Sequence, residues 1–369
     1  MTSPQPARPR WATLRWAGLV AFMLGGLALF GALIYLSGPA QVFADIKKVG
    51  VVGFLAVVLS VLASMLTWAL SWHALLRGAG IAVPWHRTVS PLLAGFAVTY
   101  LTPSMYIGGE PVRANWVARD QGIPMARVMA TVIVERILSG FSVLAFASIG
   151  AVLTLISPGV SVADKAVVGI ALGTLALILL AAVALLARDI RWISRFLRWL
   201  ARYLPGRERL LRAAGHVAEM EAEIHRAFTL YRSYTLLAFA LQLLTVFLNY
   251  VRPQIFFYFT QGDLFTFPQL SLYFTLSLFV NGFLWVTPGG FGITDGGRVG
   301  VFSLLGVPLS AALAFNVLFR FVDLILVGFG VQLLLRRGLL RLRRGRVAMT
   351  VDSTGSESKD SPPTDARLR

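Results

Sequence analysis

Charged side chains recur beside glycine- and proline-rich breaks in otherwise apolar parts of this chain. The most pronounced break runs from Val286 to Arg298 and contains one proline, five glycines, an aspartate and an arginine. A helix that begins after such a break directs unpaired N–H groups and a partial positive charge toward it, which favours anion binding. An arginine fork matches a phosphate group through two parallel hydrogen bonds. The residue types therefore predict a site for an anion, with phosphate as the best match.

The same pattern occurs earlier in the chain. In each copy a Thr-Pro pair is followed, at equal offsets, by an acidic residue and an arginine: Thr102-Pro103 with Glu110 and Arg113, and Thr287-Pro288 with Asp295 and Arg298. A Gly-x-Pro turn and a further arginine follow at equal spacing in both copies: Gly122 to Pro124 with Arg136, and Gly306 to Pro308 with Arg320. This agreement predicts an internal repeat. The alternative is that the breaks arose independently and the charges coincide.

We predict that the substrate site combines four arginines, four carboxylates and the turn residues that position them. Its members are Glu110, Arg113, Glu135, Arg136, Asp295, Arg298, Arg320 and Asp323, with Gly108, Gly109, Pro288, Gly289 and Gly290. The arginines are expected to alternate between carboxylate partners and a lipid phosphate. Glu110 with Arg113, and Arg320 with Asp323, are three residues apart and can pair on one helix face. A static network of buried ion pairs is the alternative interpretation.

The elements that must position these residues are membrane helices. The chain has 369 residues, of which 57% are hydrophobic and only 14% charged, whereas soluble domains are about 25% charged. Six apolar segments are long enough to cross the bilayer: residues 16–36, 51–76, 128–156, 166–187, 236–259 and 310–335. Two further apolar segments, 89–109 and 270–290, are broken by Pro or Gly. We therefore predict an all-α polytopic membrane protein with about six full transmembrane helices and two re-entrant broken helices.

The charge distribution predicts the topology. The net charge is +17, and an excess of Lys and Arg marks the cytoplasmic loops of membrane proteins. If both broken segments enter and leave on one side, the basic loops and both termini face the cytoplasm. If both cross completely, the arginine-rich segment 188–232 faces outward, against that rule. In the first arrangement the second unit is inverted relative to the first, which is a transporter signature. We expect the protein to lie in the inner membrane.

The domain organisation follows from these segments. Residues 1–15 form a basic cytoplasmic tail, and residues 16–346 form the transmembrane domain, with repeats at 16–156 and 166–337. Residues 188–234 are expected to form a basic amphipathic segment on the cytoplasmic membrane surface. The acids Glu219, Glu221 and Glu223 are expected on a solvated helix face. Residues 347–369, rich in Ser, Thr, Asp and Pro, are expected to be disordered.

Several function classes lack their characteristic residues. The chain contains no cysteine, which excludes disulfides, thiol nucleophiles and thiolate metal sites. Its four histidines form no metal-ligand pair at helical spacing, and we find no hydrolase, kinase, ATPase or nucleic-acid motif. We therefore expect no enzyme activity, no catalytic residue, no metal, no cofactor and no nucleic-acid partner.

The charged motifs resemble a known family. Gly108 to Arg113 (Gly-Gly-Glu-Pro-Val-Arg), Val134 to Arg136 and Pro288 to Gly292 are similar to the membrane half of lysylphosphatidylglycerol synthases. That superfamily includes stand-alone flippase-like proteins, some linked to hopanoid or glycolipid pathways, so the resemblance implies lipid translocation. It covers most of residues 16–337, but the last family motif reads Gly-x-x-Glu where this chain has Gly292 and Asp295. The synthases carry a soluble aminoacyl-transferring domain after the membrane region; we expect a stand-alone member without lysyl transfer.

The predicted function is a lipid transporter, or flippase, that moves a phosphate-bearing or lipid-linked substrate. The expected partners are membrane lipids, with anionic head groups favoured by the basic cytoplasmic surface. One alternative is an enzyme of lipid-linked synthesis that uses the intramembrane carboxylates. Another is a membrane subunit that docks a partner synthase or glycosyltransferase through residues 188–232.

Overall fold

The regular structure of the chain is helical. The computed structural model describes residues 24–102, 108–156, 192–203, 207–262, 264–284 and 287–356, with isolated positions between 165 and 184. Within these parts no strand occurs, which confirms the predicted all-α class. The elements are α2 (Pro39–Lys48), α3 (Gly50–Gly78), α4 (Trp85–Leu101), α5 (Glu110–Gln121), α6 (Met125–Ile156), α8 (Trp192–Leu200), α9 (Arg207–Thr229), α10 (Arg232–Tyr250), α11 (Arg252–Gln261), α12 (Phe267–Phe283), the 3₁₀ turn η1 (Pro288–Gly290), α13 (Ile293–Leu304) and α14 (Leu309–Ser356).

Several helices are long and apolar enough to span a membrane. Four of them qualify in the described part of the chain: Gly50–Gly78, Met125–Leu153, Arg232–Gln261 and Leu309–Gly338. A fifth candidate is the pair Leu24–Leu36 and Pro39–Lys48, which is bent by 84°. Five predicted spans therefore have a counterpart, although the first is part of a bent pair. Most of the sixth, residues 166–187, lies outside the described residues, so the structure shows four or five candidate spans.

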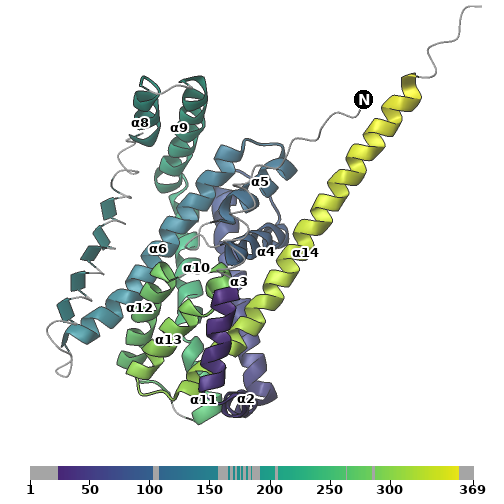
Figure 1. Cartoon of the computed structure of the whole chain (residues 1–369). Helices are drawn as coiled ribbons and strands as arrows, with labels where there is room; N and C mark the ends of the chain where they lie inside the picture. Colours follow the sequence, from purple (N-terminus) through teal and green to yellow (C-terminus); the bar gives the residue numbers. More distant parts are fainter. Residues whose placement is uncertain are drawn as a thin grey trace, which may run out of the picture.

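The long helices form a bundle whose two ends differ (Figure 1). α3 packs along α10, α6 packs against α10 and α12, and α14 crosses α4. The α8–α9 hairpin projects from one end of the bundle, whereas α2 and α11 lie at the other end (Figure 1). α5 lies toward the α8–α9 end and α13 toward the α2–α11 end. The helices that follow the two breaks therefore occupy different halves of the molecule.

An aromatic core fixes the helices of the second half of the chain. The ring of Phe302 on α13 lies 4.4 Å from that of Tyr273 on α12 and 5.2 Å from that of Phe315 on α14. Phe257 of α11 packs edge-on against Phe302 at 5.3 Å. Aromatic pairs in these geometries contribute about 0.5–1.5 kcal/mol beyond area burial. This core holds α13 firmly against α14, where the charged residues of the second motif lie.

The local structure repeats around the two breaks. α4 and α12 each have 17 residues, and α5 and α13, which follow the breaks, each have 12. Glycines with positive φ, Gly122 (64°) and Gly306 (78°), come shortly after α5 and α13. The next long helix begins three residues after the glycine in both copies, at Met125 and Leu309. The equal spacing seen in the sequence therefore corresponds to equal local structure.

Two expectations about the polar segments were wrong in part. Glu221 does not lie on a solvated face: it is buried, and its carboxylate accepts the backbone N–H groups of Ile193 (2.9 Å) and Ser194 (3.4 Å) at the start of α8. These N–H groups have no partner inside their own helix, so a buried acid can satisfy them. α14 continues to Ser356 because no proline interrupts it, so residues 347–356 are helical. The basic tail 1–15 and residues 357–369 lie outside the described residues.

Close packing of α14 on α4 yields a first prediction. A Cβ atom added to Gly330 of α14 would collide with the backbone oxygen of Leu93 on α4, whereas one added to Gly328 meets nothing within 4 Å. Gly330→Ala is expected to lower the melting temperature, because overpacking costs about 1–3 kcal/mol. Gly328→Ala, the matched control, should leave it unchanged or raise it, since alanine favours helices by about 1 kcal/mol. Equal melting temperatures in detergent would contradict this packing.

Candidate functional site

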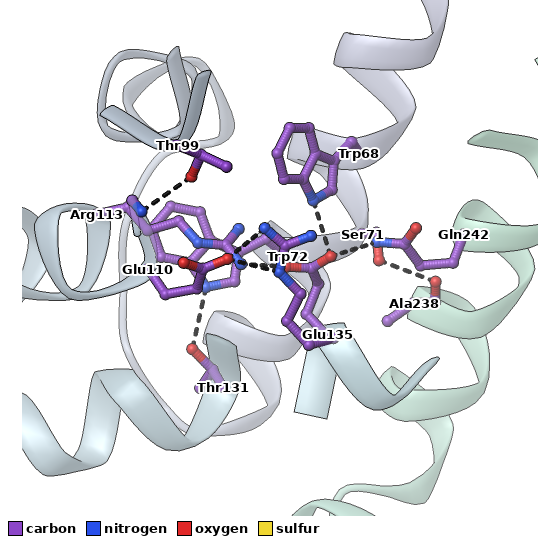
Figure 2. A network of polar contacts seen from close by, with 12 residues as sticks. Trp68, Ser71, Trp72, Thr99, Glu110, Arg113, Thr131, Glu135, Ala238 and Gln242 are labelled. Carbon is purple, nitrogen blue, oxygen red and sulfur yellow. Dashed lines mark hydrogen bonds and ion pairs between the residues drawn. The ribbon is translucent and has the colours of Figure 1, made fainter. Parts of the chain in front are cut away.

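Figure 2 shows Glu110, Arg113 and Glu135 of the first charged centre, which also contains Arg136, the ion-pair partner of Glu110. Glu110 is the first residue of α5, and its carboxylate Oε2 accepts the N–H of Gly108 at 2.8 Å. The other oxygen, Oε1, accepts Nε–H of Arg136 on α6 at 2.8 Å and also pairs with its Nη2. Burial opposes ionisation of Glu110, but the Arg136 guanidinium and the N–H donors hold the pKa of this carboxyl below its usual value. A carboxylate therefore occupies the anion position at the start of α5.

Arg113 and Glu135 form the buried part of this centre. Arg113 is 2% exposed and Glu135 is fully buried; Nη2 of Arg113 donates to Oε2 of Glu135. Glu135 also accepts Nε1–H of Trp68 (2.8 Å) and Nε2–H of Gln242 (2.7 Å). The Arg113 guanidinium lies 5.0 Å from the ring of Trp72 and 5.5 Å from that of Trp68. Glu135 thus joins α3, α5, α6 and α10 through one carboxylate.

The break before α5 is held against α4. The N–H of Gly109 donates to Oγ1 of Thr99 at 2.9 Å. A Cβ atom on Gly109 would collide with the backbone oxygen of Gly95, so only glycine fits at this position. This contact places Glu110 at the edge of α4, facing α6.

The second charged centre consists of Asp295 and Arg320, with Gly289 and Gly290 of η1. Oδ2 of Asp295 accepts the N–H of Gly292 at 3.0 Å, and Oδ1 accepts Nε–H of Arg320 at 2.7 Å. Arg320 also donates to the carbonyl oxygens of Gly289 (2.7 Å) and Gly290 (3.0 Å). Unpaired carbonyl groups are costly in a membrane interior, so Arg320 stabilises the backbone of the break.

The two centres have the same arrangement of interaction partners but differ in how far their arginines are exposed. In both, an acid in the first turn after the break accepts a backbone N–H and pairs with an arginine of the following long helix. The side chain of Arg136 is 35% exposed, whereas that of Arg320 is 6% exposed. Arg136 of the first centre is therefore partly exposed, whereas both charged groups of the second centre are enclosed.

Both centres contact consecutive residues of α4. Thr99 binds the break of the first centre, as described above, and the hydroxyl of Tyr100 accepts Nη1–H of Arg320 at 3.1 Å. One turn of α4 therefore lies against both centres.

The ion pairs differ from the pairing expected within each helix. Glu110 and Arg113 bind partners on α6, and Arg320 binds Asp295 of α13. Arg298 donates to Oδ1 of Asn281 at 2.9 Å. The expected pairing at a spacing of three residues was therefore wrong for Glu110 with Arg113, because neighbouring helices offer partners that are better placed.

Comparison with known proteins identifies the family. The model of the lysylphosphatidylglycerol synthase transmembrane region matches residues 23–330. The chain belongs to this family. It therefore contains both charged centres within the family's membrane region, and the resemblance of its motifs to that region is confirmed.

Relatives of the chain are membrane proteins. A UPF0104 membrane protein of Pyrococcus horikoshii is 25% identical over 337 residues, which is 88% of this chain and 97% of the relative. A UPF0104 membrane protein of Methanothermobacter thermautotrophicus is 31% identical over 128 residues, and this match spans only 35% of the chain and 38% of the relative. No solved structure matches the chain. Family membership and the apolar helices together show a multi-pass membrane protein.

Several residues that contact the two centres were not predicted from the sequence. Trp68, Trp72, Tyr100 and Gln242 supply hydrogen bonds or aromatic faces to the charged groups. The aromatic residues are indistinguishable from ordinary span residues by composition. Gln242, a polar residue in the middle of an apolar segment, was a usable signal.

Proposed function

We propose that this protein translocates a phosphate-bearing or lipid-linked substrate across the inner membrane. The observation that carries the proposal is the duplicated centre. At each of two helix breaks, a carboxylate occupies the anion position between backbone N–H groups and an arginine. A phosphate has the same charge sign and accepts the same donors, so it can take the place of the carboxylate without loss of hydrogen bonds.

The difference in exposure suggests the order of events. Arg136 is more exposed than Arg320, so a phosphate exchanges first with Glu110 at this centre. Arg320 must release a carboxylate, two carbonyls and a hydroxyl before it can bind a substrate. The enclosed centre therefore opens only when the chain rearranges around it, as alternating access requires.

The proposed topology has two inverted units and both termini in the cytoplasm. The arginine-rich α8–α9 hairpin and the end of α5 lie toward one end of the bundle, and α13 lies toward the other (Figure 1). The cytoplasmic bias of Lys and Arg assigns the α8–α9 end to the cytoplasm. The Glu110 break then opens from the cytoplasmic side and the Asp295 break from the outer side, and both broken segments are re-entrant.

Single cysteines test this topology without background labelling, because the natural chain has none. We introduce Gln121→Cys at the end of α5 and Leu304→Cys at the end of α13, both at exposed positions. In intact cells a membrane-impermeant maleimide should label the cysteine at position 304 and spare that at 121. Inside-out vesicles should show the opposite result. Labelling of both positions from the same face would refute the inverted arrangement.

Transport itself is measured in proteoliposomes that contain a labelled anionic lipid. Arg136→Gln is expected to slow translocation at least about tenfold, since charge-assisted hydrogen bonds contribute about 1.5–3 kcal/mol. Arg209→Gln changes an exposed arginine of α9 in the same way and should transport like the wild type. Arg113→Gln and Arg298→Gln complete the series. Wild-type rates in the folded Arg136 variant would overturn the proposed exchange.

A second candidate function is a membrane subunit that docks a partner synthase or glycosyltransferase. The observation in its favour is the outer face of α8, where Trp192, Phe196 and Trp199 are each about half exposed. The same proteoliposomes separate the candidates. Translocation by the protein alone supports the carrier, a new lipid product supports an enzyme, and activity that requires an added synthase supports docking.

A further inference from the structure

A cavity of about 270 Å³ lies between the start of α4 and the end of α5, outside both charged centres. Its polar lining residues are Arg87 of α4 with Asp120 and Gln121 of α5, and all three are exposed. The ring of Trp116 and two valines complete the described lining. The cavity therefore offers a cation, an aromatic ring and hydrogen-bonding groups to a ligand.

A second arginine, Arg337 of α14, lies at the wall of this cavity. Its Nη1 donates to Oδ2 of Asp120 at 3.0 Å, and its Nη2 pairs with the other oxygen of the same carboxylate. Nη2 also donates to the carbonyl oxygen of Trp116 at 3.2 Å, and the guanidinium lies 4.1 Å from the centre of the Trp116 ring. Three groups of α5 thus hold Arg337, and two of them belong to Trp116.

Asp120 can leave Arg337 at low cost. Its side chain is 50% exposed, so water solvates the free carboxylate, and exposed ion pairs contribute only about 0–1 kcal/mol. The ring and the carbonyl of Trp116 keep the guanidinium in place when the carboxylate leaves. A phosphate accepts the same two parallel hydrogen bonds as a carboxylate. It can therefore take the position of Asp120.

The surroundings of the cavity favour an anion at the membrane surface. Arg337 lies one residue before the end of the last candidate span, and Trp85 at the start of α4 is 51% exposed. Tryptophan is enriched where membrane helices meet the lipid head groups. Arg119 and Arg336 directly precede Asp120 and Arg337 in the chain. The surface around the cavity is therefore basic and attracts anionic head groups.

We propose that this cavity binds a phosphate group between Arg87 and Arg337, and that the phosphate displaces Asp120 from Arg337. The ligand then joins α4 to α14, while α5 loses its carboxylate contact with α14. This inference goes beyond the proposed translocation, because the site lies outside both charged centres and its occupation does not require transport.

A cysteine footprint reads this site separately from the two centres. Gln121→Cys places a thiol in the cavity lining, and Leu304→Cys at the end of α13 is the matched control; both positions are exposed, and the natural chain has no cysteine. The purified full-length protein in neutral detergent is labelled with a maleimide in the presence of dihexanoyl-phosphatidylglycerol, dihexanoylglycerol or inorganic phosphate.

The phosphatidylglycerol should slow labelling at position 121 at least about threefold, because a bound head group covers the thiol, and it should leave position 304 unchanged. Dihexanoylglycerol has no phosphate and should protect neither position. Protection by the phospholipid but not by inorganic phosphate supports the site and identifies a lipid head group as the source of the phosphate. Equal protection by inorganic phosphate supports the site and identifies a free anion.

Two substitutions of opposite sign test the charged residues in the Gln121→Cys chain. Arg87→Gln should raise the lipid concentration for half-maximal protection about fivefold or more, since it removes a charge-assisted hydrogen bond, and Arg87→Lys should recover part of the affinity. Asp120→Asn removes the internal competitor and should lower that concentration about threefold or more, because a like charge no longer opposes the anion. Arg209→Gln, on the surface of α9, should bind like its parent.

Two results overturn the proposal. If Asp120→Asn changes the melting temperature and leaves the protection unchanged, Asp120 is only a structural partner of Arg337. If dihexanoylglycerol protects position 121 as well as the phospholipid does, apolar contact explains the binding. The Asp120 variant and the comparison of ligands decide the question even if an Arg87 variant does not fold.

Binding at this cavity and transport fail separately. Protection of position 121 in a protein that does not translocate lipid in proteoliposomes supports the site and refutes the carrier function. Translocation by the wild type, without protection of position 121 by any of the phosphate ligands, refutes the site and leaves the carrier function in place.

Discussion

Glu135→Leu is expected to lower the free energy of unfolding by about 3–5 kcal/mol, because it leaves a buried arginine without its counter-ion. Arg113 is 2% exposed and lies against the rings of Trp68 and Trp72. The substitution also leaves the indole N–H of Trp68 and the amide of Gln242 without their acceptor. The melting temperature in detergent, read by intrinsic tryptophan fluorescence, measures the loss.

A double variant tests whether charge is the cause. Arg113→Met combined with Glu135→Leu removes both ions and should recover much of the stability, since a buried pair can be replaced by apolar residues of similar volume. Glu208→Leu changes an exposed acid of α9 and should have little effect. If the double variant loses at least as much stability as Glu135→Leu, packing rather than the unpaired charge explains the loss.

Arg320→Met is expected to destabilise the fold by a similar amount, about 3–5 kcal/mol, because it leaves Asp295 buried and unpaired. The carbonyls of Gly289 and Gly290 lose their donor at the same time. Arg320→Lys should recover only part of the loss, since an ammonium group cannot span the positions of a planar fork. Thermal unfolding in the same detergent measures both variants.

The first centre supplies the matched control for Arg320. Arg136 pairs with Glu110 in the same way, but its side chain is 35% exposed against 6% for Arg320. Arg136→Met should therefore cost less than Arg320→Met, because the partly exposed Arg136 is solvated in part, even though its partner Glu110 is buried. Equal losses of stability at the two arginines would show that their difference in exposure has no energetic consequence.

The sequence predicts the helical class and the positions of the breaks, because both depend on local composition. Pro and Gly cannot continue a membrane helix at low cost, so the segments around Pro103 and Pro288 are recognisable without tertiary information. The local sequence does not predict which residues the charged side chains bind. A spacing of three residues shows that Glu110 and Arg113 can meet, but it does not show that α6 presents Arg136 and Glu135 to them.

A local sequence pattern also does not predict which polar side chains are buried. Glu221 is surrounded in sequence by other acids, which is typical of a solvated face, and only the packing of α8 on α9 makes it a buried cap. The same limit applies to Arg252. Its sequence context identifies an intramembrane arginine beside a proline, whereas its neighbours Ser64 and Phe319 come from distant parts of the chain.

The contact of Thr99 and Tyr100 with both breaks has a mechanical consequence. These residues are consecutive on one rigid turn of α4, so any rotation of that turn which frees Gly109 also shifts the phenol group bound to Arg320. The first break and Arg320 of the second centre are therefore linked through adjacent residues of α4. A substitution that displaces this turn should therefore disturb the backbone at the first break and the arginine of the second centre at the same time.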